Sequence, residues 1–504
     1  MLQSFSLIIF ITLFCLQGIS GENSEKQEFK KEFWNLFKTN SKIAMNQMPP
    51  KFDSKGRRIF PKPNLGKSRE DLIQKKIDSR SHLIGFELLS GFDRNNTVQS
   101  FFPLNTPLDT NIDVIHSKKL ESRKVSVAPW SGDYWPTYRG GLGSRYDANE
   151  FPEGADFNEY LKFYETQYYP IDFNNLKSVD ALSASEKYDI ILGDEDFSLT
   201  KWSWEQSKNA RNERGEVETW FGLCHGWAPA AYMLPRPTKT IKVPIKNFQG
   251  KSFDLNLYPD DIKGLATLLW ATTPSQEVYG IGGRCNEKNP TMDDHGRLTQ
   301  SGCFDVNPGT WHIAITNQIG NLSRSFVMDA TFDYEVWNQP VVSYNVRYFH
   351  PENKDEAENP NEVTMPIKDY LSDNFKKYRN PQTKYVVGVS MEVLYTVENS
   401  ATHDLTNDEN QDNTTSVIYL YDLELDEKGN IIGGEWYQNT HPDFLWTPEH
   451  TSRARSRAED YIRSEWDGKS EVAIDIQKYG SYASKYGQPL SLIIEKLIEL
   501  SRQQ

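Results

Sequence analysis

The chain has 504 residues, enough for up to about three domains and a large hydrophobic core. Its residues are 37% hydrophobic, 13% aromatic and 25% charged. This composition contains too many aromatic residues for a disordered chain and too many polar residues for a protein with several membrane spans. Acidic residues outnumber basic ones by 70 to 56, and the net charge of -14 argues against a nucleic-acid partner, since phosphate binding depends on lysine and arginine.

The first apolar segment has the pattern of a secretory signal peptide, which we expect to comprise residues 1–21. Residues 7–16 (LIIFITLFCL) are apolar but too few to span a bilayer, and small residues follow them. The pattern predicts a secreted protein, extracellular or associated with a cell wall, without a membrane span. Sequons for N-glycosylation occur at Asn95, Asn321 and Asn413.

A basic, proline-rich segment follows the signal peptide and differs from the rest of the chain. It covers residues 22–124 and contains the stretch PPKFDSKGRRIFPKP, with dibasic pairs at residues 57–58 and 75–76. We interpret it either as a pro-segment cleaved at one of these pairs or as a solvated linker. Residues 125–450 then form the expected main domain, and residues 451–504 form a helical tail.

The main domain begins with helical patterns and continues with strands. Helical periodicity covers residues 156–167 and 183–191, and an amphipathic helix is expected at residues 490–500. Helices followed by strands predict an α+β fold, with helices packed on an antiparallel sheet. The expected strands are residues 311–316, 325–332, 341–348, 384–397 and 416–425, with a turn at 426–430 before residues 431–432.

The four cysteines leave one thiol unpaired after secretion. Removal of Cys15 with the signal peptide leaves three cysteines in an oxidising compartment. Cys285 and Cys303 flank a short loop-rich stretch and form the natural disulfide pair, which contributes about 3 kcal/mol. Cys224 then remains as an inert buried thiol, half of an intermolecular disulfide, or a nucleophile.

The sequence around Cys224, WFGLCHGWAPAA, predicts a helix start. Proline is tolerated in a first helical turn, so Pro229 favours a helix that begins between Cys224 and Trp227. The partial positive charge of a helix N-terminus lowers the pKa of a thiol, and the thiolate is the nucleophilic form. A backbone N–H near the same helix start could stabilise an oxyanion.

A base for this thiol is expected at His312, in the alternating segment GTWHIAIT, because the adjacent His225 would point in another direction. Residues 320–321 have the pattern of a two-residue hairpin turn. Such a hairpin would pair His312 with Asp329, with Cβ atoms about 4.5 to 5.5 Å apart. The pair predicts a catalytic triad of Cys224, His312 and Asp329, and a structural hydrogen bond between the last two is the alternative.

Four blocks in order along the chain resemble the transglutaminase elicitor family of secreted oomycete proteins. They are WFGLCHGWAPAA, DVNPGTWHIAITNQIG, FVMDATFDYEVWNQPVVSY and IIGGEWYQNTHPDFLW. The resemblance covers residues 130–446 and implies a transglutaminase and papain-like cysteine-nucleophile core. It also implies that Cys224 attacks the γ-carboxamide of a protein glutamine, and that a lysine or small amine resolves the thioester to an isopeptide. His312 would act as general base and acid, and Asp329 would orient it.

The resemblance implies further properties of the site. In the family a surface element, VWNQP, is recognised by plant hosts; here it comprises Val336, Trp337, Asn338, Gln339 and Pro340. The residues by themselves favour a role for Trp337 in packing beside Asp329. Trp220 and Trp227 are candidates for the wall of a substrate channel or for core packing. Calcium is implied as a cofactor, with acidic residues such as Asp293 and Asp422 as candidate ligands, although no loop has EF-hand spacing.

The sequence is therefore consistent with three functions. A transglutaminase would act on proteins that carry glutamine and lysine side chains. A papain-like cysteine protease or amidase would use the same thiol with water as the acceptor, and a non-catalytic cell-surface antigen or elicitor would use its cysteines for stability or cross-linking. Incorporation of a fluorescent amine into a glutamine donor, without peptide-bond cleavage, distinguishes the first function.

Overall fold

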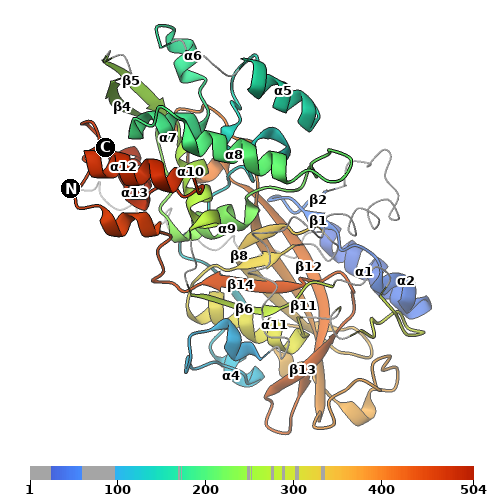
Figure 1. Cartoon of the computed structure of the whole chain (residues 1–504). Helices are drawn as coiled ribbons and strands as arrows, with labels where there is room; N and C mark the ends of the chain where they lie inside the picture. The colour runs from blue at the N-terminus through green and yellow to red at the C-terminus, as the bar shows by residue number, and fades with distance from the viewer. Residues whose placement is uncertain are drawn as a thin grey trace, which may run out of the picture.

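The computed structural model describes residues 24–59, 97–167, 171, 173–246, 250, 252–273, 277–285, 290–300, 303, 306–330 and 335–503. These residues form an α+β structure in which helices pack on a large antiparallel sheet, as the order of elements predicts (Figure 1). The expected signal peptide, the dibasic pair at residues 75–76 and the sequon residue Asn95 lie outside them. Every helix among the described residues is too short or too polar to cross a bilayer.

Three long antiparallel strands form the centre of the sheet: β8 (Asn338–Phe349), β11 (Tyr385–Val397) and β12 (Asn413–Leu425). Their β-branched and aromatic residues predict all three. The other strands of this sheet are β1 (Lys51–Phe52), β2 (Arg58–Ile59), β3 (Ser122–Lys124), β6 (Val278–Gly282), β7 (Val327–Asp329), β9 (Glu356–Ala357), β10 (Met365–Pro366), β13 (Ile431–Trp436) and β14 (Phe444–Pro448). The main order is β2-β1-β12-β11-β8-β7-β14-β6. A separate hairpin joins β4 (Ile241–Lys246) and β5 (Ser252–Leu257).

Two hydrophobic clusters lie on opposite faces of the sheet. The α11 cluster contains Met328 and Tyr421 and receives helix α11 (Pro308–Ile315). The α9 cluster contains Val327 and Trp446 and receives helices α9 (Cys224–Met233) and α10 (Pro259–Thr272). Val327 and Met328 are adjacent residues of β7, and successive strand residues point to opposite faces, so this part of the sheet separates the clusters.

The helices over the α9 cluster come from the middle and the C-terminus of the chain (Figure 1). Helix α7 (Ala184–Leu192) lies where the periodicity of residues 183–191 predicts a helix, and it begins at a capping box between Ser183 and Glu186. Helix α13 (Ser491–Arg502) is the predicted terminal amphipathic helix and packs against α10. The C-terminal residues therefore contribute to the same hydrophobic cluster as α9 and α10. Further α-helices among the described residues are α4 (Ile112–Ser117), α5 (Phe157–Gln167), α6 (Leu176–Asp180), α8 (Ser198–Asn209) and α12 (Ile474–Ser484).

The beginning of the basic segment packs on the sheet. Helix α1 (Ser24–Thr39) buries Phe29 and Phe33 in a third cluster with Phe349, and α2 (Ser41–Met45) follows it. Burial of each phenylalanine contributes about 2 kcal/mol. Strand β1 then pairs with the edge of β12. Residues 24–59 therefore have specific contacts with the body, which a solvated linker would lack.

The predicted disulfide joins Cys285 to Cys303 and leaves Cys224 as a free cysteine. The backbone N–H of Cys285 donates to the carboxylate of Asp443 at 3.0 Å. Since Asp443 directly precedes β14, the disulfide lies beside the start of that strand.

Candidate active site

Cys224 is the first residue of α9, as the sequence predicts. The N–H of Gly226 donates to the carbonyl of Leu223, and the N–H of Leu223 donates to the carbonyl of Tyr134 at 2.6 Å. At Gly226 the backbone of α9 comes so close to α10 that a Cβ atom would lie 2.2 Å from the carbonyl oxygen of Thr267. Glycine at this position therefore allows the close helix packing that holds the thiol in place.

The thiol of Cys224 is enclosed by the start of β8. The residue is 2% exposed. Its S–H donates to the carbonyl oxygen of Val336, with Sγ 3.7 Å from that oxygen. The side-chain amide of Asn338 donates to the sulfur, with Nδ2 3.6 Å from Sγ. The sulfur is thus held between one acceptor and one donor, two residues apart in the sequence.

Burial raises the pKa of Cys224 to about 11. The N–H groups of Asn338 act in the opposite direction, while the negative charges of Glu398 and Asp329 raise the pKa further. The expectation that the helix N-terminus lowers the thiol pKa is therefore wrong for this enclosed state. Removal of water from the sulfur outweighs the helix charge, which is worth about 0.3–1 kcal/mol at an exposed site.

Asp329 lies on the same face of the sheet as this thiol. It ends β7, is fully buried and pairs with Asn338 of β8. Its Oδ1 accepts the backbone N–H of Trp337 at 3.1 Å. Val327, two residues earlier on the same face, belongs to the α9 cluster. The structure therefore brings Cys224 and Asp329 together, with Asn338 in contact with the sulfur and paired with Asp329.

His312 lies on a helix, whereas its sequence predicts a strand. Asn307 caps the first turn of α11 by accepting the N–H of Gly309, and the chain continues as a π-helix over Thr316–Asn321. The predicted hairpin, and with it the cross-strand pair of His312 and Asp329, is therefore wrong. The alternation in GTWHIAIT covers only eight residues, and enclosure of nearly all of them within the α11 cluster overrides such a short pattern.

The imidazole of His312 is on the other face of the sheet from the thiol. Its Nδ1 lies 2.8 Å from the hydroxyl oxygen of Tyr421, which belongs to the α11 cluster. Its Nε2 has no hydrogen-bond partner within the part of the chain that the structure describes. Burial lowers the pKa of His312 to about 3. Val336, which contacts the thiol, belongs instead to the α9 cluster.

The VWNQP segment is buried, whereas the resemblance implies a surface element. Val336 and Asn338 are fully buried, Gln339 is 3% exposed and Pro340 is buried opposite β7. Trp337 is partly buried. The reason is topological: these residues lead into and begin β8, which lies inside the sheet, and they cover the thiol.

The tryptophans near the thiol are packing residues in this structure. The ring of Trp337 lies 5.4 Å from that of Tyr134, and its backbone bonds to Asp329, as the packing interpretation predicts. Trp220 and Trp227 belong to the α9 cluster. The indole N–H of Trp227 donates to the carbonyl of Trp130 at 3.2 Å. A role of these two residues as the wall of a substrate channel remains a prediction.

Sequence reasoning missed the contacts of four polar side chains at the site, which are those of Asn338, Gln339, Glu398 and Trp446. The indole N–H of Trp446 donates to Oδ1 of Asn338 at 2.8 Å. Glu398, directly after β11, accepts two bonds from the amide of Gln339 at 2.9 and 3.0 Å, and burial raises its pKa to about 7. The sequence feature that could have indicated these contacts is the pair of amides, Asn338 and Gln339, at the start of an otherwise apolar strand.

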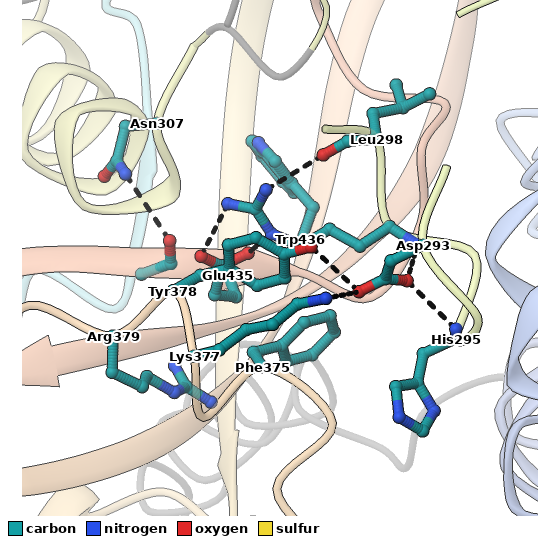
Figure 2. Close-up of polar contacts among 12 residues, drawn as sticks. Asp293, His295, Leu298, Asn307, Phe375, Lys377, Tyr378, Arg379, Glu435 and Trp436 are labelled. Carbon is teal, nitrogen blue, oxygen red and sulfur yellow. Dashed lines mark hydrogen bonds and ion pairs between the residues drawn. The ribbon is translucent and has the colours of Figure 1, made fainter. Parts of the chain in front are cut away.

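Asp422 and Asp293, the two carboxylates named as candidate calcium ligands, bind side chains of the protein. Asp422 pairs with Arg379 at 2.6 Å. Asp293 accepts the hydroxyl of Tyr378 at 3.0 Å and pairs with Lys377 at 3.5 Å (Figure 2). Among the described residues, no group of three or more His, Cys, Asp or Glu side chains could hold a metal ion. These residues therefore do not fit a calcium site.

Comparison with known proteins identifies the family. A family model described as "Transglutaminase elicitor" matches residues 96–460. The chain matches no curated protein. It is similar to the crystal structure of the GP42 transglutaminase from Phytophthora sojae, with 21% sequence identity and a TM-score of 0.46, over 77% of this chain and 96% of that chain. Because the family model covers well over half of the chain, the chain belongs to the transglutaminase elicitor family.

Proposed function

We propose that the chain is a secreted protein-glutamine γ-glutamyltransferase with Cys224 as its nucleophile. The observation that carries the proposal is the position of the free thiol, at the start of α9 and against Asn338, with Asp329 on the same face. These residues lie within the segment that matches the family model. An unpaired thiol at a helix start, beside polar buried groups, is an arrangement suited to acyl transfer.

The proposed reaction has two balanced steps. In the first, the sulfur of Cys224 forms a bond to the γ-carbonyl carbon of a glutamine, the C–N bond breaks, and ammonia leaves with the thiol proton. In the second, a primary amine attacks the thioester, an isopeptide bond forms, and the thiol is restored with a proton from the amine. The amine acceptor would be a lysine side chain, so the substrates would be proteins.

The enclosed thiol sets a requirement for this reaction. A protonated sulfur that is 2% exposed and bonded to the carbonyl of Val336 cannot reach a glutamine side chain. Substrate binding must therefore separate the start of β8 from α9 enough to replace the contact with Val336. The same opening would return water to the sulfur and lower the pKa of Cys224, since burial is the main cause of its increase.

The family resemblance gives His312 the role of general base and acid and Asp329 that of its carboxylate, but the His312 imidazole lies against Tyr421 on the other face of the sheet from Cys224, so of this triad only Cys224 and Asp329 are brought together. The contact of His312 with Tyr421, across the sheet from Cys224, means that this role requires a test separate from that of the nucleophile. Secretion belongs to the same proposal, whereas host recognition of the VWNQP segment would require exposure of residues that this structure buries. Exposure of the sequon residues Asn321 and Asn413 is compatible with a secreted glycoprotein.

The test uses the full-length secreted chain, a glutamine-containing donor protein and a fluorescent primary amine. We expect label on the donor without peptide-bond cleavage, and no label with the Cys224→Ala variant. Cleavage of the donor without label would favour the cysteine protease. Absence of both reactions, with a correctly folded chain, would favour a non-catalytic antigen.

A further inference from the structure

Asn338 is a buried polar residue for which the fold gives a single orientation. It is the first residue of β8, is fully buried and pairs with Asp329 of β7. The start of α9 lies over it, so its side chain contacts the sulfur of Cys224. A buried side-chain amide must have partners for its oxygen and its nitrogen, because an unpaired one costs about 1–3 kcal/mol.

Trp446 determines which end of this amide faces the sulfur. An indole N–H can only donate, so the atom 2.8 Å from Nε1 of Trp446 must be the amide oxygen. The nitrogen of the amide is therefore the atom that lies 3.6 Å from Sγ. The orientation follows from the chemistry of the two side chains and does not depend on distinguishing oxygen from nitrogen by their positions.

The direction of this hydrogen bond favours one charge state of the sulfur. An N–H donor stabilises a thiolate more than a thiol, whereas the carbonyl of Val336 accepts an S–H and stabilises the thiol. The negative charges of Asp329 and Glu398 also disfavour the thiolate, because they raise the pKa of the thiol. Asn338 supplies both a side-chain and a backbone N–H that act in favour of it.

We propose that Asn338 is a catalytic residue whose side-chain amide stabilises the Cys224 thiolate, and that Trp446 is the positioning residue that directs this amide at the sulfur. The inference rests on the proposed function, since it assigns a role in the same acyl transfer. When the substrate displaces the carbonyl of Val336, the amide of Asn338 remains as the donor to the sulfur. Stabilisation of the thiolate lowers the barrier to the attack that forms the C–S bond; the amide itself forms and breaks only hydrogen bonds.

The test measures the rate of alkylation of Cys224 by iodoacetamide as a function of pH, with full-length chains. We expect Asn338→Ala to raise the midpoint of this profile by about one pH unit, which leaves about 10-fold less thiolate at a given pH below it. Asn338→Asp should raise it further, because it adds a negative charge at the sulfur to those of Asp329 and Glu398. Trp446→Phe retains the aromatic ring without the N–H and should shift the midpoint in the same direction by a smaller amount.

Two controls separate this role from a structural one. Asn345→Ala removes an exposed amide from the same strand and should leave the midpoint unchanged. In the amine-incorporation assay, Asn338→Ala should lower kcat by about 10-fold with little change in KM, because the amide contacts the reacting sulfur. If Asn338→Ala does not fold, the alkylation profile of Trp446→Phe tests the same contact.

Profiles of Asn338→Ala and Trp446→Phe that coincide with that of the unmodified chain would overturn the inference. Alkylation does not require transferase activity. A chain that incorporates no amine, but whose alkylation midpoint shifts in both variants, would therefore refute the proposed function and leave the contact between Asn338 and the thiolate intact.

Discussion

Replacement of Cys224 by alanine tests the proposed nucleophile, and its cost in stability follows from the burial of the sulfur. The side chain is 2% exposed, so removal of one methyl-sized group loses about 0.8 kcal/mol of transfer free energy. The cavity that remains and the loss of a partner for the Asn338 amide together add about 1 kcal/mol to this destabilisation. We therefore expect Cys224→Ala to abolish amine incorporation and to lower the free energy of unfolding by about 2 kcal/mol.

The assay combines amine incorporation with denaturant unfolding of the same preparations. Cys224→Ser is the matched control, because serine keeps a hydrogen-bonding group of similar size between Val336 and Asn338. We expect Cys224→Ser to be closer in stability to the unmodified chain than Cys224→Ala is, and to be inactive as well. The two variants together separate loss of the nucleophile from loss of packing.

Two results would refute this reasoning. Retained labelling in Cys224→Ala would show that another residue carries the acyl group. A loss of stability well above about 4 kcal/mol in Cys224→Ala would mean that the sulfur supports the fold far more than its contacts account for, and inactivity would then be explained by unfolding.

Further predictions concern the other groups of the site. Asp329→Asn should lower the alkylation midpoint of the thiol, because the Asp329 charge raises the thiol pKa; the proposed triad also predicts a fall of up to about 10,000-fold in amine incorporation, and an unchanged rate would assign the carboxylate to structure. His312→Gln should abolish amine incorporation if His312 is the base, and full activity would exclude it. The pKa of His312 is lowered from 6.5 to about 3 in the folded chain, so its contribution to stability is complete above pH 6.5 and is lost as the pH falls toward 3. Denaturant midpoints at pH 7 and pH 5 should therefore differ less in His312→Gln than in the surface control His450→Gln; an equal difference would contradict burial of a neutral imidazole. Gly226→Ala should destabilise the fold by about 1–3 kcal/mol or more, because its Cβ would lie 2.2 Å from the carbonyl oxygen of Thr267, and an unchanged thermal midpoint would refute the close packing of α9 on α10.

The sequence by itself determined the elements whose signals are local. The capping box of Ser183 and Glu186 starts α7, and the β-branched and aromatic run of residues 384–397 forms β11. The segment around Cys224 gave the start of α9 correctly. Cysteine count and spacing gave the disulfide of Cys285 and Cys303 and the free thiol. Each of these signals depends on neighbouring residues or on covalent chemistry, so it does not require knowledge of distant contacts.

The tertiary structure alone decided the conformation and face of His312. The short alternating run that contains it predicts a strand, but its enclosure within the α11 cluster favours the helix instead. That choice replaces Asp329 by Tyr421 as the partner of the imidazole.

The tertiary structure also decided the environment of the thiol. The start of β8 brings Val336 and Asn338 against Cys224, and Trp446 of β14 orients the amide of Asn338. These residues are more than a hundred positions from Cys224 along the chain, so only the order of strands brings them together. Removal of water by these contacts raises the pKa of the thiol, whereas the local helix start favours a lower value.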